Sequence, residues 1–115
     1  MEDSILNSIK KLLGLTEDYT VFDPDIIIHI NTFLGVLNQM GVGRPGFTIE
    51  DDEATWEDFL GNHGVSLNEA KTYIALRVKM VFDPPSSSLV ADAMNKNIEE
   101  LGWRLNVKVD PEDFV

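Results

Sequence analysis

The sequence contains no cysteine, and this absence excludes both a disulfide framework and a thiolate metal site. No apolar run is long enough to span a bilayer, and the first residues are acidic where a secretory signal would be basic. We therefore expect a protein that folds inside a cell and has no membrane segment. At 115 residues, the chain has room for one domain with one modest core.

Basic residues are scarce. The chain has 9 Lys and Arg against 20 Asp and Glu, which gives a formal net charge of −11. Proteins that hold a nucleic-acid backbone usually carry a basic patch, because their affinity comes from neutralising phosphates and releasing counterions. The few bases of this chain are scattered, so tight duplex binding is disfavoured. An acidic surface suits a protein that stays soluble or that must not adhere to DNA.

The spacing of apolar residues predicts an all-α fold, a small bundle of four to five helices. Residues 4–13 have apolar side chains at helical spacing, with Lys10 and Lys11 on the opposite side. A longer core helix is expected after Asp23, a good N-cap residue, with Pro24 at the first helical position. Glycines end this helix just after residue 40.

The middle of the chain changes character. Residues 41–53, GVGRPGFTIEDDE, predict a turn-rich loop with a short strand over 47–49. The loop ends in four successive acids, Glu50, Asp51, Asp52 and Glu53. They lack the alternating ligand spacing and the glycine of a calcium loop, so we interpret them as a solvated acidic segment. An electrostatic role in an assembly is the alternative.

Two short signals start the next helices. Thr55 is expected to cap a helical turn or two that Trp56 anchors, and Ser66 with Glu69 forms a capping box. The helix after that box should run to residue 82. A rigid corner follows, because two prolines cannot continue a helical hydrogen-bond ladder. This structural corner consists of Phe82, Asp83, Pro84, Pro85 and Ser86.

The last predicted helix starts after the corner, with Ser86 or Ser87 as its cap, and packs on the preceding helix as a hairpin. Its apolar residues form a narrow stripe of the coiled-coil kind. These residues are Val90, Met94, Ile98, Leu101 and Leu105. The remaining residues alternate in polarity, so we predict a helical domain over 1–105 and an extended C-terminal tail over 106–115. Such a tail has too little chain to build its own sheet and suits addition to a neighbour's strand edge.

The sequence contains no recognisable catalytic or metal-binding motif. His29 lies in an apolar helical run and His63 lies in a loop, and neither has the partners of a zinc site. The serines after the corner have no neighbouring base, and helix capping explains them. We predict no catalytic, metal or cofactor-binding residue, and no cofactor. For Trp56 and Trp103, core packing is favoured over contact with a partner.

Several motifs together resemble the head–tail connector (adaptor, or head-completion) proteins of tailed bacteriophages. The most specific is TYIALRVKMVFDPPSSS, followed by a helix that ends in ELGWRLNV. The segments SIKKLLGL and DPDIIIHINTFLGVLNQMGVG and the turn ATWEDFLG fit as well, so the similarity covers nearly the whole chain.

The resemblance implies a non-enzymatic virion protein at the head–tail junction, made in the host cytoplasm before assembly. It implies a homo-oligomeric ring of about twelve copies beneath the portal protein. The ring would extend the DNA channel without binding DNA specifically, and would dock the next neck or tail-completion protein. No membrane contact is expected.

Two sets of residues are candidates for these roles. The candidate subunit or partner interface comprises Val90, Met94, Ile98, Leu101, Trp103, Leu105, Val107, Val109 and Phe114. The candidate channel-lining acids are Glu50, Asp51, Asp52 and Glu53, whose charge would keep DNA from adhering to the wall.

Other functions fit parts of the pattern. A small acidic interaction protein, such as a DNA mimic or an inhibitor of a basic partner, also needs negative charge and no catalytic site. It would be a monomer or dimer rather than a ring. A helix-turn-helix regulator is disfavoured, because a double-proline corner is a poor recognition turn and the last helix starts with Ser, Leu, Val and Ala where base-reading side chains should stand. An enzyme fits least.

Overall fold

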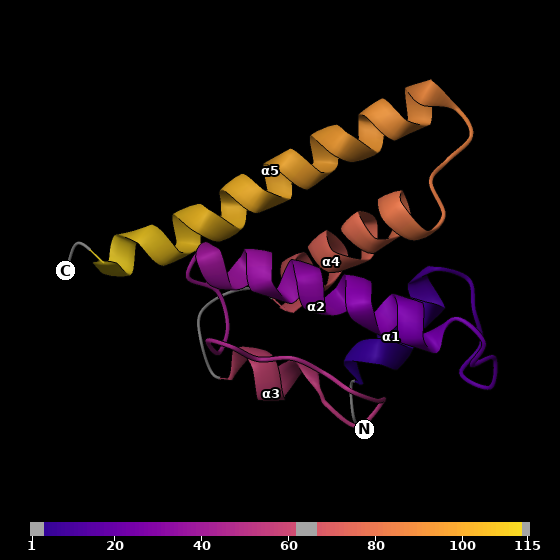
Figure 1. Cartoon of the computed structure of the whole chain (residues 1–115). Helices are drawn as coiled ribbons and strands as arrows, with labels where there is room; N and C mark the ends of the chain where they lie inside the picture. The colour runs from indigo at the N-terminus through magenta and orange to yellow at the C-terminus, as the bar shows by residue number, and fades with distance from the viewer. Residues whose placement is uncertain (1–3, 62–66, 114–115) are drawn as a thin grey trace.

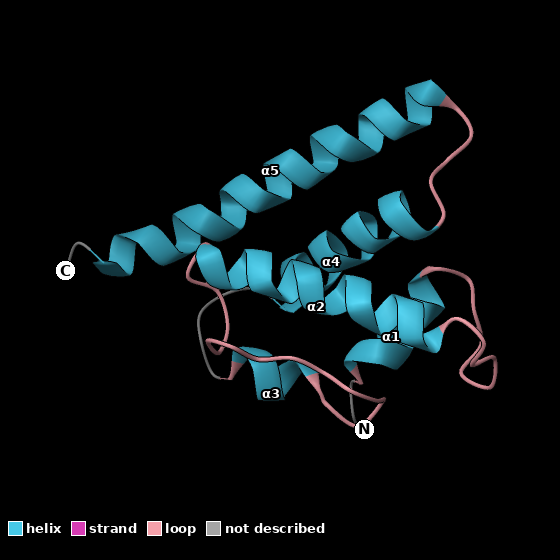
Figure 2. Ribbon diagram, viewed as in Figure 1, coloured by secondary structure: helices cyan, strands magenta, loops and turns pink. Residues whose placement is uncertain are grey.

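The described part of the computed structural model comprises residues 4–61 and 67–113, without the side chains of residues 106–113. It is an all-α bundle, as predicted, and contains no strand (Figures 1 and 2). Its helices are α1 (Ile5–Leu12), α2 (Asp23–Gln39), α3 (Trp56–Leu60), α4 (Leu67–Phe82) and α5 (Ser88–Asp113).

Helix α4 lies at the centre of the packing. Both α2 and α5 pack along α4, and the short α1 packs against α2 and α4. Figure 1 shows α5 as the longest helix, on the opposite side of the molecule from α3. One buried apolar cluster joins all five helices. Its members include Ile5, Ile9, Ile26, Ile30, Leu34, Leu37, Trp56, Phe59, Tyr73, Ile74, Val78, Ile98 and Leu105.

Helix α1 lies within the predicted segment 4–13, and its N-cap is Ser4, whose hydroxyl accepts a hydrogen bond from the Asn7 amide at 3.2 Å. The prediction for Lys10 is wrong. Its side chain is only 1% exposed, whereas Lys11 is exposed. Residues 13–23 fold back so that the Lys10 ammonium meets Asp23 Oδ1 at 2.9 Å and donates to the Glu17 carbonyl at 3.1 Å. A buried lysine needs such partners.

The same ion pair corrects the predicted start of α2. Asp23 is the first helical residue and Phe22 occupies the N-cap position without a side-chain cap bond. The Asp23 carboxylate turns toward Lys10 instead of capping its own helix. The Phe22 ring packs edge-on against Tyr19 and Phe82, with ring centroids 5.8 and 5.3 Å apart. These contacts connect the α1–α2 loop to the end of α4.

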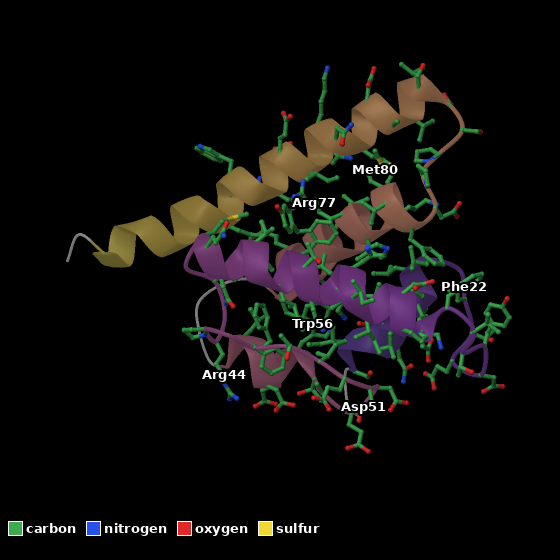
Figure 3. The ribbon with its side chains drawn as sticks, viewed as in Figure 1. Phe22, Arg44, Asp51, Trp56, Arg77 and Met80 are labelled. Carbon is green, nitrogen blue, oxygen red and sulfur yellow. The ribbon has the colours of Figure 1, made fainter. Side chains whose placement is uncertain are left out.

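Helix α3 is short but firmly attached. Thr55 and Asp58 form a reciprocal capping box, which confirms Thr55 as the cap. The Trp56 indole is buried and donates to the Ser8 hydroxyl at 2.8 Å, so it joins α3 to α1. Figure 3 shows Trp56 below α2. Two independent bonds therefore hold this region, since the Ile5 amide also donates to the Ala54 carbonyl.

The corner breaks the chain where expected. Helix α4 ends at Phe82, and the Lys79 ammonium bonds both the carbonyl and the carboxylate of Asp83 at 3.1 and 3.2 Å. Helix α5 then begins at Ser88, with the Ser87 hydroxyl accepting from the Val90 amide at 3.4 Å. The predicted hairpin of α4 and α5 is confirmed. Ser66 of the predicted capping box lies outside the described residues.

Two predicted extended segments are not extended strands. Residues 47–49 form no strand, because both backbone groups of Ile49 bond the Asn31 side chain instead of a neighbouring strand. The extended conformation predicted for 106–115 is also wrong as far as Asp113, where α5 ends. A helix satisfies its own backbone groups, whereas an isolated strand needs an edge to pair with. Residues 114 and 115 lie outside the described part.

Candidate interaction surfaces

The apolar stripe predicted for the last helix serves mainly the chain itself. Ile98 and Leu105 are buried in the core, and Met94 and Leu101 are partly buried. Val90 is exposed. The spacing was therefore correct for a helix-packing face, but the packing partner of its second half is α4 of the same chain.

Trp103 is the largest predicted interface residue that remains on the surface. The core packing predicted for both tryptophans is confirmed for Trp56 but wrong for Trp103, whose side chain is 66% exposed. The residues after it continue α5, which projects beyond the other helices at its C-terminal end (Figure 1). Val107 and Val109 belong to this projecting part, but their side chains and Phe114 lie outside the description. An exposed tryptophan on a projecting helix is typical of surfaces that contact other proteins.

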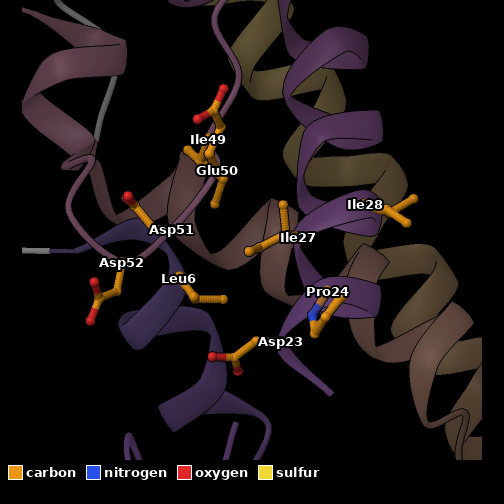
Figure 4. Close-up of a pocket in the computed structure, with 9 residues that line it drawn as sticks. All are labelled: Leu6, Asp23, Pro24, Ile27, Ile28, Ile49, Glu50, Asp51 and Asp52. Atoms are coloured by element: carbon orange, nitrogen blue, oxygen red, sulfur yellow. The ribbon is translucent and has the colours of Figure 1, made fainter. Parts of the chain in front are cut away.

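A groove of about 680 Å³ lies between the first turns of α2 and the loop segment 49–52. Its floor and one wall are apolar, and Figure 4 shows Ile27 pointing between the two segments with Leu6 of α1 below. The opposite rim is acidic. The complete lining is Leu6, Asp23, Pro24, Ile27, Ile28, Ile49, Glu50, Asp51 and Asp52.

Asn31 fixes the acidic side of this groove. Its amide nitrogen donates to the Ile49 carbonyl at 3.0 Å, and its amide oxygen accepts from the Ile49 amide at 2.8 Å. This pair of bonds ties the loop to α2 directly before the acidic run. Glu50, Asp51, Asp52 and Glu53 are all exposed, and Figure 3 shows Asp51 at the edge of the molecule. The structure thus brings the four predicted acids together, three of them on the groove rim.

Sequence reasoning missed the apolar half of the groove, although a signal was present. Ile26, Ile27 and Ile28 are consecutive, and successive helical residues point about 100° apart. One face of a helix cannot bury all three. Ile26 is fully buried, Ile27 is partly buried, and Ile28 is 62% exposed beside the groove.

Other candidate features do not form a reactive site in the described part of the chain. No group of three or more His, Cys, Asp or Glu side chains is arranged there to hold a metal ion. His29 is a partly buried residue of α2, and His63 lies outside the description. None of the described helices has the length and apolar character that crossing a membrane requires.

Comparison with known proteins supplies one match. A family model described as a phage connector protein matches residues 5–112, which is nearly the entire chain. No curated protein and no solved structure matches the chain.

Proposed function

The chain belongs to the phage connector protein family, a family of structural proteins of the head–tail junction, and we propose that it forms a ring beneath the portal. In this role it extends the DNA channel and docks the next neck or tail component. The observation that carries the proposal is the family match over residues 5–112, which leaves no room for a second, unrelated domain within that span.

Ring formation needs a contact between two different surfaces of neighbouring subunits, because head-to-tail contacts that close generate a ring. We propose that exposed Trp103 and the projecting end of α5 supply one of these surfaces. Val90, Val107, Val109 and Phe114 remain candidates for the same contact. Ile98 and Leu105 would contribute indirectly, since they hold α5 on its own subunit. A ring of about twelve copies stays a prediction of the family resemblance.

The surface charge is compatible with a DNA conduit. The net charge of −11 would keep the protein from adhering to passing DNA. The lining of the channel by Glu50, Asp51, Asp52 and Glu53 stays a prediction. The proposed location is the virion after assembly and the host cytoplasm before it, with the portal and a downstream neck or tail protein as partners.

A phage that lacks this gene tests the proposed function. We expect it to produce DNA-filled heads that carry no tails or that lose their DNA, because the portal would lack its extension. Electron microscopy and nuclease sensitivity of the packaged DNA provide the measurements. Supplying the protein from a plasmid should restore tailed particles. Infectious tailed particles from the deletion phage without complementation would contradict the proposal.

A further inference from the structure

We propose that the groove between α2 and residues 49–52 is the docking site for a segment of the portal protein that carries an aliphatic side chain flanked by lysine or arginine. This inference rests on the proposed function and adds to it a specific surface and a specific partner chemistry. It depends on the apolar wall, the acidic rim and the charge balance of the chain.

The apolar wall is the first step. Figure 4 shows Ile27, which is partly buried, pointing into the groove, with Pro24 nearby on α2. Ile28 is 62% exposed and lines the outer edge of the groove, on the side of α2 that faces away from residues 49–52. A volume of about 680 Å³ is large enough for a few residues of a bound peptide. An apolar lining that ends in an exposed isoleucine favours an occupant that has an aliphatic side chain of its own.

The acidic rim is the second step. Glu50, Asp51 and Asp52 are exposed, and none of them forms an ion pair with another described residue. Asp51 also accepts a hydrogen bond from the Glu53 amide at 2.9 Å, which gives the run a defined turn. The bonds from Asn31 hold this rim opposite α2. Three carboxylates on one side of an apolar groove are complementary to lysine or arginine.

The charge balance of the chain argues against a second copy as the occupant. Each copy has 20 acidic against 9 basic residues, so a second copy offers few positive side chains to an acidic rim. Several of the nine basic residues already form ion pairs with acidic residues of the same chain. Lys10 is buried against Asp23, Lys79 pairs with Asp83, and Arg104 pairs with Glu100. A different protein is the better source of positive charge.

Among the partners in the proposed function, the portal is the one present when the connector joins the head. In this docking site, the acidic residues of the rim would bind a partner instead of lining the DNA channel. A rim covered by a bound segment does not face an open channel, so the two assignments of Glu50, Asp51 and Asp52 exclude one another.

The test is the affinity of the full-length protein for the purified portal oligomer of the same phage, measured by biolayer interferometry. Two groove variants are Glu50→Gln with Asp52→Asn, and Ile28→Ser. Their matched controls on α5 are Asp92→Asn with Glu99→Gln, and Leu89→Ser, since all three control positions are exposed. Circular dichroism verifies that each variant is folded.

We expect each groove variant to raise the Kd for the portal about tenfold, and each control to change it less than about twofold. The charge-neutralised groove variant should also lose part of the salt dependence of binding. Such a result supports the docking site.

Four outcomes would overturn the inference. Equal affinities of groove and control variants would reject the site while leaving the connector function intact. Failure of the unmodified protein to bind the portal would contradict portal docking itself. An effect confined to self-association, measured by sedimentation velocity, would identify a second copy as the occupant. Normal portal binding with loss of binding to the downstream component, or with altered DNA ejection, would assign the rim to those roles instead.

Discussion

Replacing Trp56 by alanine is expected to lower the free energy of unfolding by about 4 kcal/mol. The Trp56 side chain is 1% exposed and lies where α3 meets α1. Its loss removes a large apolar contact, leaves a cavity and leaves the Ser8 hydroxyl without its indole donor. Since small domains have a total stability of about 5–15 kcal/mol, this loss removes a large fraction of the stability. Urea denaturation followed by circular dichroism measures the change.

Two further tryptophan variants serve as controls. Trp56→Phe retains most of the packing and should cost about 1–2 kcal/mol, mainly through the lost hydrogen bond. Trp103→Ala should change folding stability by less than about 0.5 kcal/mol, because that side chain is largely exposed, and should instead weaken subunit association. Equal destabilisation by Trp56→Ala and Trp103→Ala would contradict the assignment of one tryptophan to the core and the other to the surface.

Replacing Lys10 by methionine is expected to cost about 3 kcal/mol. Methionine fills a similar volume, so the loss comes from the uncompensated carboxylate of Asp23 and the unbonded carbonyl of Glu17. Asp23 retains partial solvent contact and lies at the N-terminus of α2, where the helix dipole favours negative charge. These two factors place the expected cost at the lower end for a buried pair. Thermal and urea unfolding provide the measurement.

The neighbouring lysine supplies a matched control. Lys11→Met removes the same charge from an exposed position and should have an effect of less than about 0.5 kcal/mol. The double variant Lys10→Met with Asp23→Asn should be more stable than Lys10→Met alone, because the unpaired charge is gone. If Lys10→Met and Lys11→Met have equal effects, the ion pair does not hold the α1–α2 loop.

Several local signals predicted the local structure correctly. Thr55 and Ser87 cap helices where their side chains have free backbone amides to accept from, and Pro84 and Pro85 end a helix because they cannot donate. Such effects depend on only a few neighbouring residues. They are therefore visible in the sequence before the fold is known.

Features that depend on distant segments could not be predicted in this way. Lys10 lies on the polar side of its helix by spacing, yet the loop before Asp23 covers it. The apolar stripe of α5 fits equally a packing face within the chain or between subunits, and only the fold shows that Ile98 and Leu105 face inward. The groove requires α2 and the acidic loop to lie side by side. One indication of this groove was present in the sequence. The core-facing side of α2 cannot bury three consecutive isoleucines, so one of them, Ile28, is left on the surface.

Cryo-electron microscopy of the purified protein mixed with portal-bearing, DNA-filled capsids tests the central claim most directly. The connector function predicts a ring of additional density on the outer face of the portal, with subunits matching this helical bundle and a central opening continuous with the portal channel. Bare portals at saturating protein concentration, or subunits bound elsewhere on the capsid, would contradict it.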